Sequence, residues 1–468
     1  MIIRNKLILL LIPALLSCGK KDFSGDEIFV ERNELIAEQK ELAKFANLDL
    51  VNNCLGYVKD ASDDLSLLNC ENKIDSLEKI KHKKYSLGGD YQSNLMKNSN
   101  RPISFNELLL ISNNEKIVIF DTEREEVVGK VNIKHFLSKK DLFKLSRFSI
   151  NKTDEETVVV SGDNGLVAKY DVSEIIKQYH QWKKQNKYFG NPINGIKIKP
   201  IWSNKVNGSI NAPVTVVSGN IFAISNDDTI FLLDEKNGEI ADYNQRSRNL
   251  QISTNTVVGL LKYQNQIIAS FGNGEVVSYS AKENKLQTNW SYDVVHDGNS
   301  QLKNIKSSDI DFQPTIINNL LFVGGISGGF MAINLNTGIP IGVREFSVAS
   351  NIANNGKFLF FIDSFYNLIA VNSQTLAVIW HVQLDDFINK NFITKMFAVN
   401  KKKIYTGPFF INDKIGLIVD NGEMLFLDLT SGLIVKKKSI TKEINSLPLN
   451  IDQKLYLIDK NNILHLYY

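Results

Sequence analysis

The chain has 468 residues, of which 43% are hydrophobic, so it can bury a sizeable core and is not a wholly disordered protein. Its 54 Lys and Arg residues nearly balance its 51 Asp and Glu residues, and the resulting net charge of +3 gives no case for a nucleic-acid partner. Three cysteines are too few for a disulfide-rich scaffold.

The first residues have the pattern of a secretory signal. Arg4 and Lys6 precede an apolar run over 7–16, which is too short to span a bilayer. The run ends in Leu15-Leu16-Ser17-Cys18, which resembles the cleavage box of bacterial lipoproteins. That resemblance implies a signal peptide at 1–17 and acylation of Cys18, which would anchor the chain in membrane lipid. An ordinary signal peptide that happens to precede a cysteine is the alternative.

The residue after Cys18 bears on location. It is Gly19 and not Asp, which in the Gram-negative sorting pattern resembles an outer-membrane lipoprotein. The resemblance implies a protein that is lipid-anchored to the outer membrane and faces the periplasm.

Residues 18–80 are predicted to form an acylated tether with two helices. Ile28, Leu35 and Leu42 recur every seven residues among Glu and Lys, and a second helical pattern covers 62–81. Cys54 and Cys70 are candidates for a disulfide that would join the two helices in an oxidising compartment. Two buried free thiols are the alternative.

From about residue 85 onward one pattern occurs eight times. An apolar strand, a polar turn and a second apolar strand end at an anchor position, and these positions are 121, 171, 234, 280, 334, 372, 428 and 467. Successive anchors lie 38 to 63 residues apart, which scatters around the blade length of a propeller built from four-stranded sheets. The sequence therefore predicts an all-β fold, an eight-bladed β-propeller over residues 81–468.

The eighth copy stops after its third strand, so its outermost strand is missing. The segment 83–89, Lys-Lys-Tyr-Ser-Leu-Gly-Gly, looks like the strand that follows the other anchors, such as 436–440, and it has no copy of its own. We therefore predict that this N-terminal strand closes the last blade and removes the free edge of an open sheet.

The third strand and the turn after it resemble the quinoprotein-type propeller repeat, Ala-x-Asp-x-x-Thr-Gly-x-x-x-Trp. Residues 332–338 and 370–380 match it best, and Trp290, Trp380 and Trp202 stand where the docking Trp is expected. A helical insert at 172–188 interrupts blade two. It is either a solvated excursion capped on the blade or a contact arm.

A search for catalytic chemistry finds no nucleophile elbow, phosphate loop or zinc motif. The histidines are scattered, and none lies within five residues of another. The chain also lacks the adjacent cysteines of most quinone-dependent dehydrogenases. We therefore expect no enzyme activity, no cofactor and no metal site, with a periplasmic quinoprotein enzyme as the alternative.

The lipoprotein box, the eight repeats and the C-terminus on a third strand together resemble the BamB family of outer-membrane lipoproteins. The resemblance covers about 81–468 and is better from Gly238 onward. It implies a non-catalytic scaffold of the outer-membrane β-barrel assembly complex. Such a scaffold binds the periplasmic domains of the barrel-inserting, BamA-like subunit and assists nascent outer membrane proteins. A lipoprotein propeller that binds another envelope partner is the alternative.

In that family two adjacent loops on one face bind the barrel-inserting subunit. Leu250-Gln-Ile252-Ser253 falls where one loop has Leu-x-Leu-Arg, so Ser replaces the Arg and a shifted Arg246 or Arg248 would supply the charge. Ser308-Asp309-Ile310-Asp311 matches the Ser-Asp-x-Asp of the other loop. The resemblance therefore implies that Leu250, Ile252, Asp309 and Asp311 bind the partner, as an apolar pair beside carboxylates. Turn capping by the two aspartates is the alternative.

Overall fold

The computed structural model of the chain describes residues 82–87, 102–105, 107–113, 116–132, 148–185, 193, 198, 200–210, 212–246, 258–294, 310, 312–326, 328–384, 404–411, 413–440, 444, 448–451, 454–459 and 461–467. The predicted signal peptide, the two-helix tether, Cys18, Cys54 and Cys70 lie outside these residues, so they stay predictions, as do the domain boundaries. No helix among the described residues is long and apolar enough to cross a membrane.

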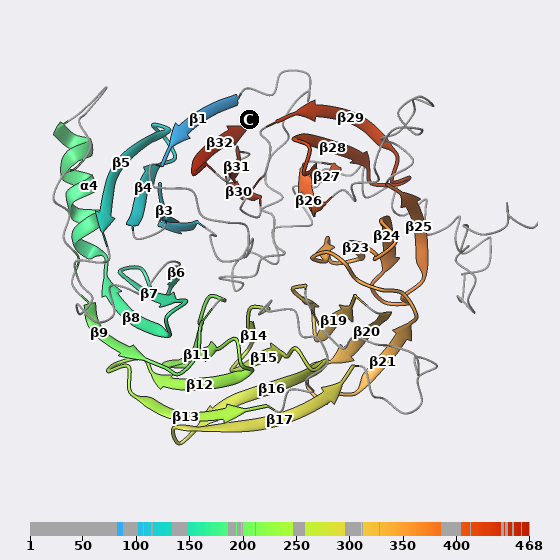
Figure 1. Cartoon of the computed structure of the whole chain (residues 1–468), viewed down its shortest axis with the longest axis horizontal. Helices are drawn as coiled ribbons and strands as arrows, with labels where there is room; N and C mark the ends of the chain where they lie inside the picture. Colours follow the sequence, from blue (N-terminus) through green and yellow to red (C-terminus); the bar gives the residue numbers. More distant parts are fainter. Residues whose placement is uncertain are drawn as a thin grey trace, which may run out of the picture.

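The strands of the described part of the chain form eight four-stranded antiparallel sheets, which stand as blades around a ring (Figure 1). This confirms the predicted all-β, eight-bladed propeller. The strands of each blade are given from the centre of the ring outward. Blade one has β2 (Ile103–Phe105), β3 (Leu108–Asn113), β4 (Lys116–Asp121) and β5 (Glu126–Asn132), and blade two has β6 (Phe148–Lys152), β7 (Thr157–Gly162), β8 (Leu166–Asp171) and β9 (Pro200–Lys205). Blade three has β10 (Thr215–Val217), β11 (Asn220–Ile224), β12 (Thr229–Asp234) and β13 (Ile240–Gln245), and blade four has β14 (Leu261–Tyr263), β15 (Gln266–Ser270), β16 (Glu275–Lys282) and β17 (Lys285–Asp293).

The other four blades follow the same order. Blade five has β18 (Thr315–Ile317), β19 (Leu320–Gly325), β20 (Gly328–Asn334) and β21 (Pro340–Arg344), and blade six has β22 (Ala353–Asn354), β23 (Phe358–Ile362), β24 (Asn367–Asn372) and β25 (Val378–Gln383). Blade seven has β26 (Tyr405–Ile411), β27 (Lys414–Val419), β28 (Glu423–Asp428) and β29 (Ile434–Ser439), and blade eight has β30 (Leu449–Ile451), β31 (Lys454–Ile458), β32 (Ile463–Tyr467) and β1 (His82–Ser86). Each predicted repeat copy therefore corresponds to the second and third strands of one blade.

The N-terminal strand β1 closes the ring. It pairs antiparallel with β32, with His82 opposite Tyr467 and Ser86 opposite Ile463. Figure 1 shows it as the blue arrow beside the red strands at the C-terminus. The prediction that an early strand completes the last blade is confirmed, and β32 has a partner on each side.

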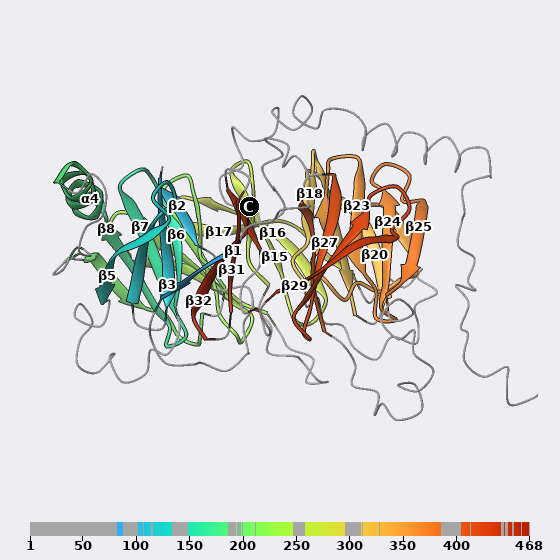
Figure 2. The same ribbon diagram turned by 90° about the horizontal axis from the view of Figure 1, so that it is seen from above.

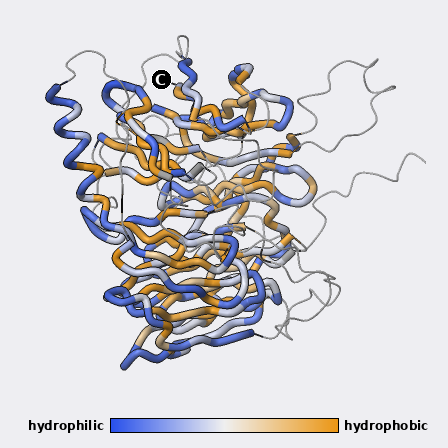
Figure 3. The backbone as a smooth tube through the Cα atoms, turned by 60° about the vertical axis from the view of Figure 1, so that its left-hand side comes forward, coloured by the Kyte–Doolittle hydropathy of each residue, from blue (hydrophilic) through white to orange (hydrophobic). Residues whose placement is uncertain are grey.

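The core lies between the blades. Among the described residues, one cluster of buried hydrophobic side chains fills each junction between neighbouring blades. In blade one, Leu108 and Leu110 face blade two, whereas Leu109 and Ile111 face blade eight. Because successive side chains of a strand point to opposite faces, both faces of a blade are buried and its strands read as continuous apolar runs. Figure 3 shows the hydrophobic residues along these strands and the hydrophilic ones at the turns.

Tryptophans dock neighbouring blades at three junctions of the described ring. The indole Nε1 of Trp202, Trp290 and Trp380 donates to the carbonyl of Glu235 (2.9 Å), Leu335 (2.7 Å) and Leu429 (3.1 Å), respectively, on the next blade. These are the tryptophans that the repeat motif indicated. Each ring lies on the glycine of the neighbouring turn, at Gly238, Gly338 and Gly432.

Other side chains take the place of the tryptophan at further junctions. Between blades five and six, the guanidinium of Arg344 donates to the carbonyls of Leu376 and Thr375, both at 3.0 Å. Between blades eight and one, the carboxylate of Glu125 accepts from Lys454 at 2.7 Å and from Lys83. Burial opposes ionisation of Glu125, but the hydrogen bonds from the two lysines hold its pKa below the usual value.

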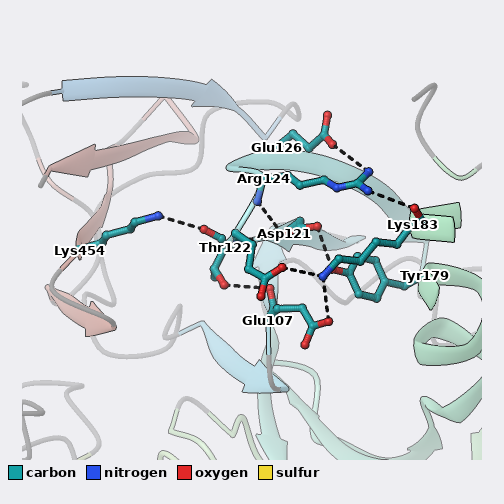
Figure 4. A network of polar contacts seen from close by, with 9 residues as sticks. Glu107, Asp121, Thr122, Arg124, Glu126, Tyr179, Lys183 and Lys454 are labelled. Carbon is teal, nitrogen blue, oxygen red and sulfur yellow. Dashed lines mark hydrogen bonds and ion pairs between the residues drawn. The ribbon is translucent and has the colours of Figure 1, made fainter. Parts of the chain in front are cut away.

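The insert of blade two forms helix α4 (Ser173–Gln185), slightly shorter than the predicted 172–188. Its buried residues, Ile175, Tyr179 and Trp182, belong to the core shared by blades one and two. The Tyr179 hydroxyl donates to Asp121 Oδ2 at 2.8 Å, and Lys183 Nζ pairs with Glu123 at 2.7 Å (Figure 4). The described helix therefore lies on blade one, beside β5, and does not project from the ring.

The chain after α4 also contacts this blade. Ile193 forms a parallel bridge with Gly129 of β5, and its N–H donates to the carbonyl of Val128 at 2.6 Å. The insert therefore covers part of the outer edge of blade one, which protects backbone groups that an edge strand would expose.

Candidate partner-binding face

One face of the ring carries the connections from the outer strand of each blade to the inner strand of the next. Because neighbouring strands are antiparallel, the turns between the second and third strands lie on the same face. Hydrogen bonds join these segments, for example from Val294 N to Gly274 O (3.0 Å) and from Leu384 N to Tyr366 O (2.9 Å). We name this side the loop face. The turns between the third and fourth strands lie on the opposite face. Figure 2 shows the ring from the side, with the two faces at the two ends of the strands.

The four predicted partner-binding residues belong to two neighbouring connections of the loop face. Leu250 and Ile252 fall between β13 and β14, which join blades three and four, and Asp309 and Asp311 fall between β17 and β18, which join blades four and five. All four residues lie outside the described part of the chain. The structure thus gives the positions of the loop ends and leaves the four assignments as predictions.

A buried glutamine ties the ends of these two loops together. The Gln313 side chain accepts from Gly259 N at 3.0 Å and donates to Gly259 O at 3.1 Å. Gly259 follows the first loop and Gln313 follows the second, so one amide joins both. A buried amide that satisfies both backbone groups of one residue holds them in a fixed geometry. The only pattern that could have indicated this role is the place of Gln313 in the Phe-Gln-Pro stretch after Asp311.

Apolar side chains hold the same loop ends. Val258, Val294 and Ile310 are buried in the cluster that blades four and five share, each with 2% of its surface exposed. Ile310 lies between the two predicted aspartates, so the chain is fixed to the core at the centre of the Asp-Ile-Asp stretch. The two loops therefore leave the ring from one packed base.

Arg246, at the start of the first loop, is already paired. Its guanidinium donates to Glu275 Oε1 at 3.1 Å and to the Tyr279 hydroxyl at 2.9 Å, and both partners belong to blade four. Burial raises the pKa of the Tyr279 phenol, so the hydroxyl stays neutral and accepts the bond. This geometry does not favour Arg246 as the replacement for the arginine that Ser253 lacks. Arg248 lies outside the described residues.

No cluster of three or more His, Cys, Asp or Glu side chains that could hold a metal ion occurs in the described ranges. A network of polar side chains surrounds the turn Thr122–Glu125 and joins blade eight, blade one and helix α4 (Figure 4). Its lysines and carboxylates pair with one another across elements, as structural ion pairs do.

Comparisons with known proteins agree with the ring. A family model described as outer membrane protein assembly factor BamB matches residues 198–382, a range that contains both candidate loops. The curated outer membrane protein assembly factor BamB of Shewanella oneidensis is 22% identical over 153 residues, 32% of this chain. The aligned region spans 35% of that relative's length. The crystal structure of BamB from Moraxella catarrhalis aligns with a TM-score of 0.59 at 14% identity, covering 82% of this chain and 99% of that one.

The chain is a BamB-like propeller.

Two further solved structures share the fold of this BamB-like propeller. The computationally designed Ika8 protein aligns with a TM-score of 0.53 at 11% identity, covering 81% of this chain and 100% of that one. The quinohemoprotein alcohol dehydrogenase ADHIIG from Pseudomonas putida HK5 aligns with a TM-score of 0.51 at 9% identity, covering 82% of this chain and 75% of that one. Since an enzyme shares the fold, the function of the BamB-like propeller has to be argued from its loop face.

Proposed function

We propose that the chain is a non-catalytic scaffold lipoprotein of the outer-membrane β-barrel assembly complex. Its loop face binds the periplasmic domains of the barrel-inserting, BamA-like subunit and so assists the insertion of nascent outer membrane proteins. One observation carries the proposal: the two loops that hold the predicted contact residues leave the ring side by side, with their ends joined by Gln313. The BamB family model covers the same region.

The roles within the face follow from the residue types. Leu250 and Ile252 supply the apolar centre of the contact, where desolvation contributes most to binding. Asp309 and Asp311 supply a charged rim, which selects a basic partner surface and speeds association. The packed base at Val258, Val294 and Ile310 limits the conformational freedom that binding must remove.

The pattern of the N-terminal residues supports a membrane location for this proposed scaffold. Cleavage after residue 17 leaves Cys18 as the acylated anchor, and several acyl chains hold a soluble domain at a bilayer far better than one. Residues 18–80 are the proposed tether, in which Cys54 and Cys70 are candidates for a disulfide. The propeller, 81–468, then faces the periplasm from the outer membrane.

The test is binding of the purified chain to the periplasmic domains of the barrel-inserting subunit. Reversing both rim charges, Asp309→Arg with Asp311→Arg, is expected to weaken binding at least about tenfold, because the two positive charges repel the basic surface. The matched control is Glu239→Arg with Glu283→Arg, which reverses two exposed carboxylates in turns of the opposite face. Unchanged binding of the Asp309 and Asp311 variant, or an equal loss in the control, would show that the loop face is not the interface.

The quinoprotein reading makes a separate prediction. An enzyme of that class takes up a quinone cofactor, which is seen directly by its absorbance. The scaffold proposal expects no such uptake by the full chain at micromolar cofactor. A stoichiometric absorbance change would contradict the proposal whatever the binding experiment shows.

A further inference from the structure

The hairpins between second and third strands have polar tips on most of the loop face. In blades two, three, four and seven the tips consist only of Asp, Asn or Gly residues. These tips are 163–165, 226–228, 272–274 and 421–422, respectively. These residue types suit tight turns because they tolerate a left-handed backbone or bond to the backbone. The hairpin of blade six, between β23 and β24, instead has Ser364-Phe365-Tyr366 at its tip. Turn chemistry does not account for two aromatic residues at this place.

The aromatic tip is exposed and held rigidly. Phe365 keeps 60% of its surface exposed. Its N–H donates to Asp363 Oδ1 at 2.9 Å, and its carbonyl accepts from Gln383 Nε2 at 2.8 Å. A large side chain on a fixed backbone loses little conformational entropy when it is buried by a partner.

The next residue has an unusual backbone conformation. Tyr366 has a φ of 64°, where the equivalent positions of blades two, four and seven have glycine, at 84°, 85° and 88°. A residue with a Cβ is disfavoured in this left-handed region, so the surrounding structure has to hold the Tyr366 backbone there. The Tyr366 ring lies 6.1 Å from the ring of Tyr405 on blade seven, which links the hairpin to the next blade.

Two further exposed hydrophobic residues lie on the loop face, on the blades to either side of this hairpin. Ile326, in the turn of blade five, is 36% exposed, and Ile404, directly before β26 of blade seven, is 56% exposed. The remaining large hydrophobic residues that are exposed in the described ranges lie on or directly before the outer strands β9, β13, β21 and β29. We name Ile326, Phe365 and Ile404 the apolar arc, because they occupy three consecutive blades.

Hydrogen bonds connect the apolar arc to the base of the two candidate loops. Gln313 N, at the end of the second loop, donates to Asn351 Oδ1 at 3.1 Å. Asn351 belongs to the connection between blades five and six, in which Val348 N donates to Gly325 O at 2.9 Å beside Ile326. In the same connection, the hydroxyls of Ser347 and Ser364 lie 2.7 Å apart, next to Phe365. The backbone beside Ile326 and Phe365 is thus linked to the base of the two loops.

We propose that the apolar arc is a second contact for the periplasmic domains of the barrel-inserting subunit, with Phe365 as its anchor. This rests on the proposed function, because it extends the same interface from blades three to five onto blades five to seven. The arc receives an apolar patch of the partner, whereas the aspartate loop receives a basic one. Exposed hydrophobic groups rimmed by polar residues are typical of protein-binding surfaces.

The experiment compares variants of the full chain in binding to the subunit's periplasmic domains. Phe365→Ser is expected to weaken binding about tenfold or more, the size of effect seen for buried aromatic anchors. Phe365→Leu keeps an apolar side chain and is expected to stay within about threefold of the parent. Ile339→Ser is the matched control, because Ile339 is 61% exposed in a turn of the opposite face. Equal melting temperatures of all three variants show that folding is intact.

The outcomes separate this inference from the proposed function. If the Asp309 and Asp311 charge reversal weakens binding while Phe365→Ser binds like the parent, the arc assignment is wrong and the proposed function stands. If neither variant loses affinity, both fail. If Phe365→Ser leaves the subunit bound but weakens capture of an unfolded outer membrane protein, the arc binds clients and the assignment to the subunit is overturned.

Discussion

At the scale of single residues, the blade junctions depend on a glycine under each docking tryptophan. Gly338 has a φ of 72°, and a Cβ at this position would lie 2.6 Å from Trp290. Gly238 and Gly432 are in the same situation beneath Trp202 and Trp380, at 2.2 Å and 2.5 Å. The three sites share this geometry. It explains why the repeat motif contains both a glycine and a tryptophan: the indole ring occupies the space that a side chain on the glycine would fill.

Gly338→Ala is expected to destabilise the protein more than Gly219→Ala. Gly219 has a similar φ of 77° with no atom within 4 Å of its added Cβ, so this control measures the backbone cost alone, about 1 kcal/mol. At Gly338 the indole has to move as well, which adds about 1 to 3 kcal/mol. Urea unfolding of both variants gives the two free energies of unfolding. Equal losses would mean that the tryptophan contact tolerates a methyl group.

The side chains that link blades where the tryptophan is missing could not be predicted from the sequence. Arg344 reaches the carbonyls of Thr375 and Leu376, and Lys454 reaches Glu125 across 329 positions of the chain. No periodicity or motif relates residues so far apart, whereas the Trp and Gly positions recur inside each repeat. Residue types that repeat with the fold were therefore predictable, and the contacts that replace them were not.

At the scale of elements, the seam between β1 and β32 contains a chain of three ionisable groups. His82 Nε2 lies 2.9 Å from His465 Nδ1, and His465 Nε2 lies 3.0 Å from Asp459 Oδ2. The His82 ring also stacks on Tyr467, with centroids 4.4 Å apart. With Asp459 ionised, His465 donates to the carboxylate and accepts from His82, so the bonds are complete with both imidazoles neutral. A proton on each imidazole would place two donors against each other.

The surroundings of the seam keep the histidines neutral. Burial, followed by electrostatic repulsion from His465, Lys84 and Lys438, lowers the pKa of His82 from 6.5 to about 4. Burial also lowers the pKa of His465, although Asp459 opposes this shift. Because the unfolded histidines take up protons first as the pH falls, the stability that neutral His82 contributes is complete above pH 6.5 and is lost between 6.5 and about 4.

The seam is therefore expected to loosen in acid before the rest of the ring. Amide protection in 82–86 and 463–467, corrected for the intrinsic exchange rate, should fall between pH 7 and pH 5 relative to the strands of blade six. His82→Gln should reduce this pH dependence, because only one imidazole of the pair is left to take up a proton. His180→Gln, on the exposed side of α4, is the matched control and should leave it unchanged. Protection that does not change with pH would contradict the proposed role of the two histidines.

Helix α4 could be predicted from the sequence pattern, but the blade on which it packs could not. Apolar residues at 175, 179 and 182 predict a helix with one buried face, which the structure has. The element against which this face packs is not given by the pattern, because the ion pair between Lys183 and Glu107 joins positions 76 residues apart. The structure thus shows that the helix lies on blade one, and a contact of its exposed face with a partner stays a prediction.

At the scale of the whole molecule, the repeat made the ring predictable. Eight copies, an incomplete last blade and an unassigned early strand leave closure by β1 as the economical arrangement, and β1 pairs with β32 as expected. The loop face could be predicted only through the family resemblance, since loops carry no periodic signal. Its structural base at Gln313 and the aromatic hairpin tip at Phe365 depend on burial and backbone conformation, which a single sequence does not display.

A closed ring suits a scaffold because its loops keep fixed relative positions. Each blade is packed on both sides, so a displacement of one loop base has to move two hydrophobic clusters. Because the loop bases are rigid, less conformational entropy is lost when a partner binds. The proposed interface therefore uses the fold for positioning and the loops for recognition.

Hydrogen exchange of the full chain, with and without the periplasmic domains of the barrel-inserting subunit, tests the central claim most directly. Binding through the loop face predicts slower exchange in 247–257, in 295–311 and in the hairpin tip 363–366 when the partner is present. The turns of the opposite face, such as 335–339, should exchange at unchanged rates. Slowing confined to those opposite turns, or no slowing at saturating partner, would contradict the claim.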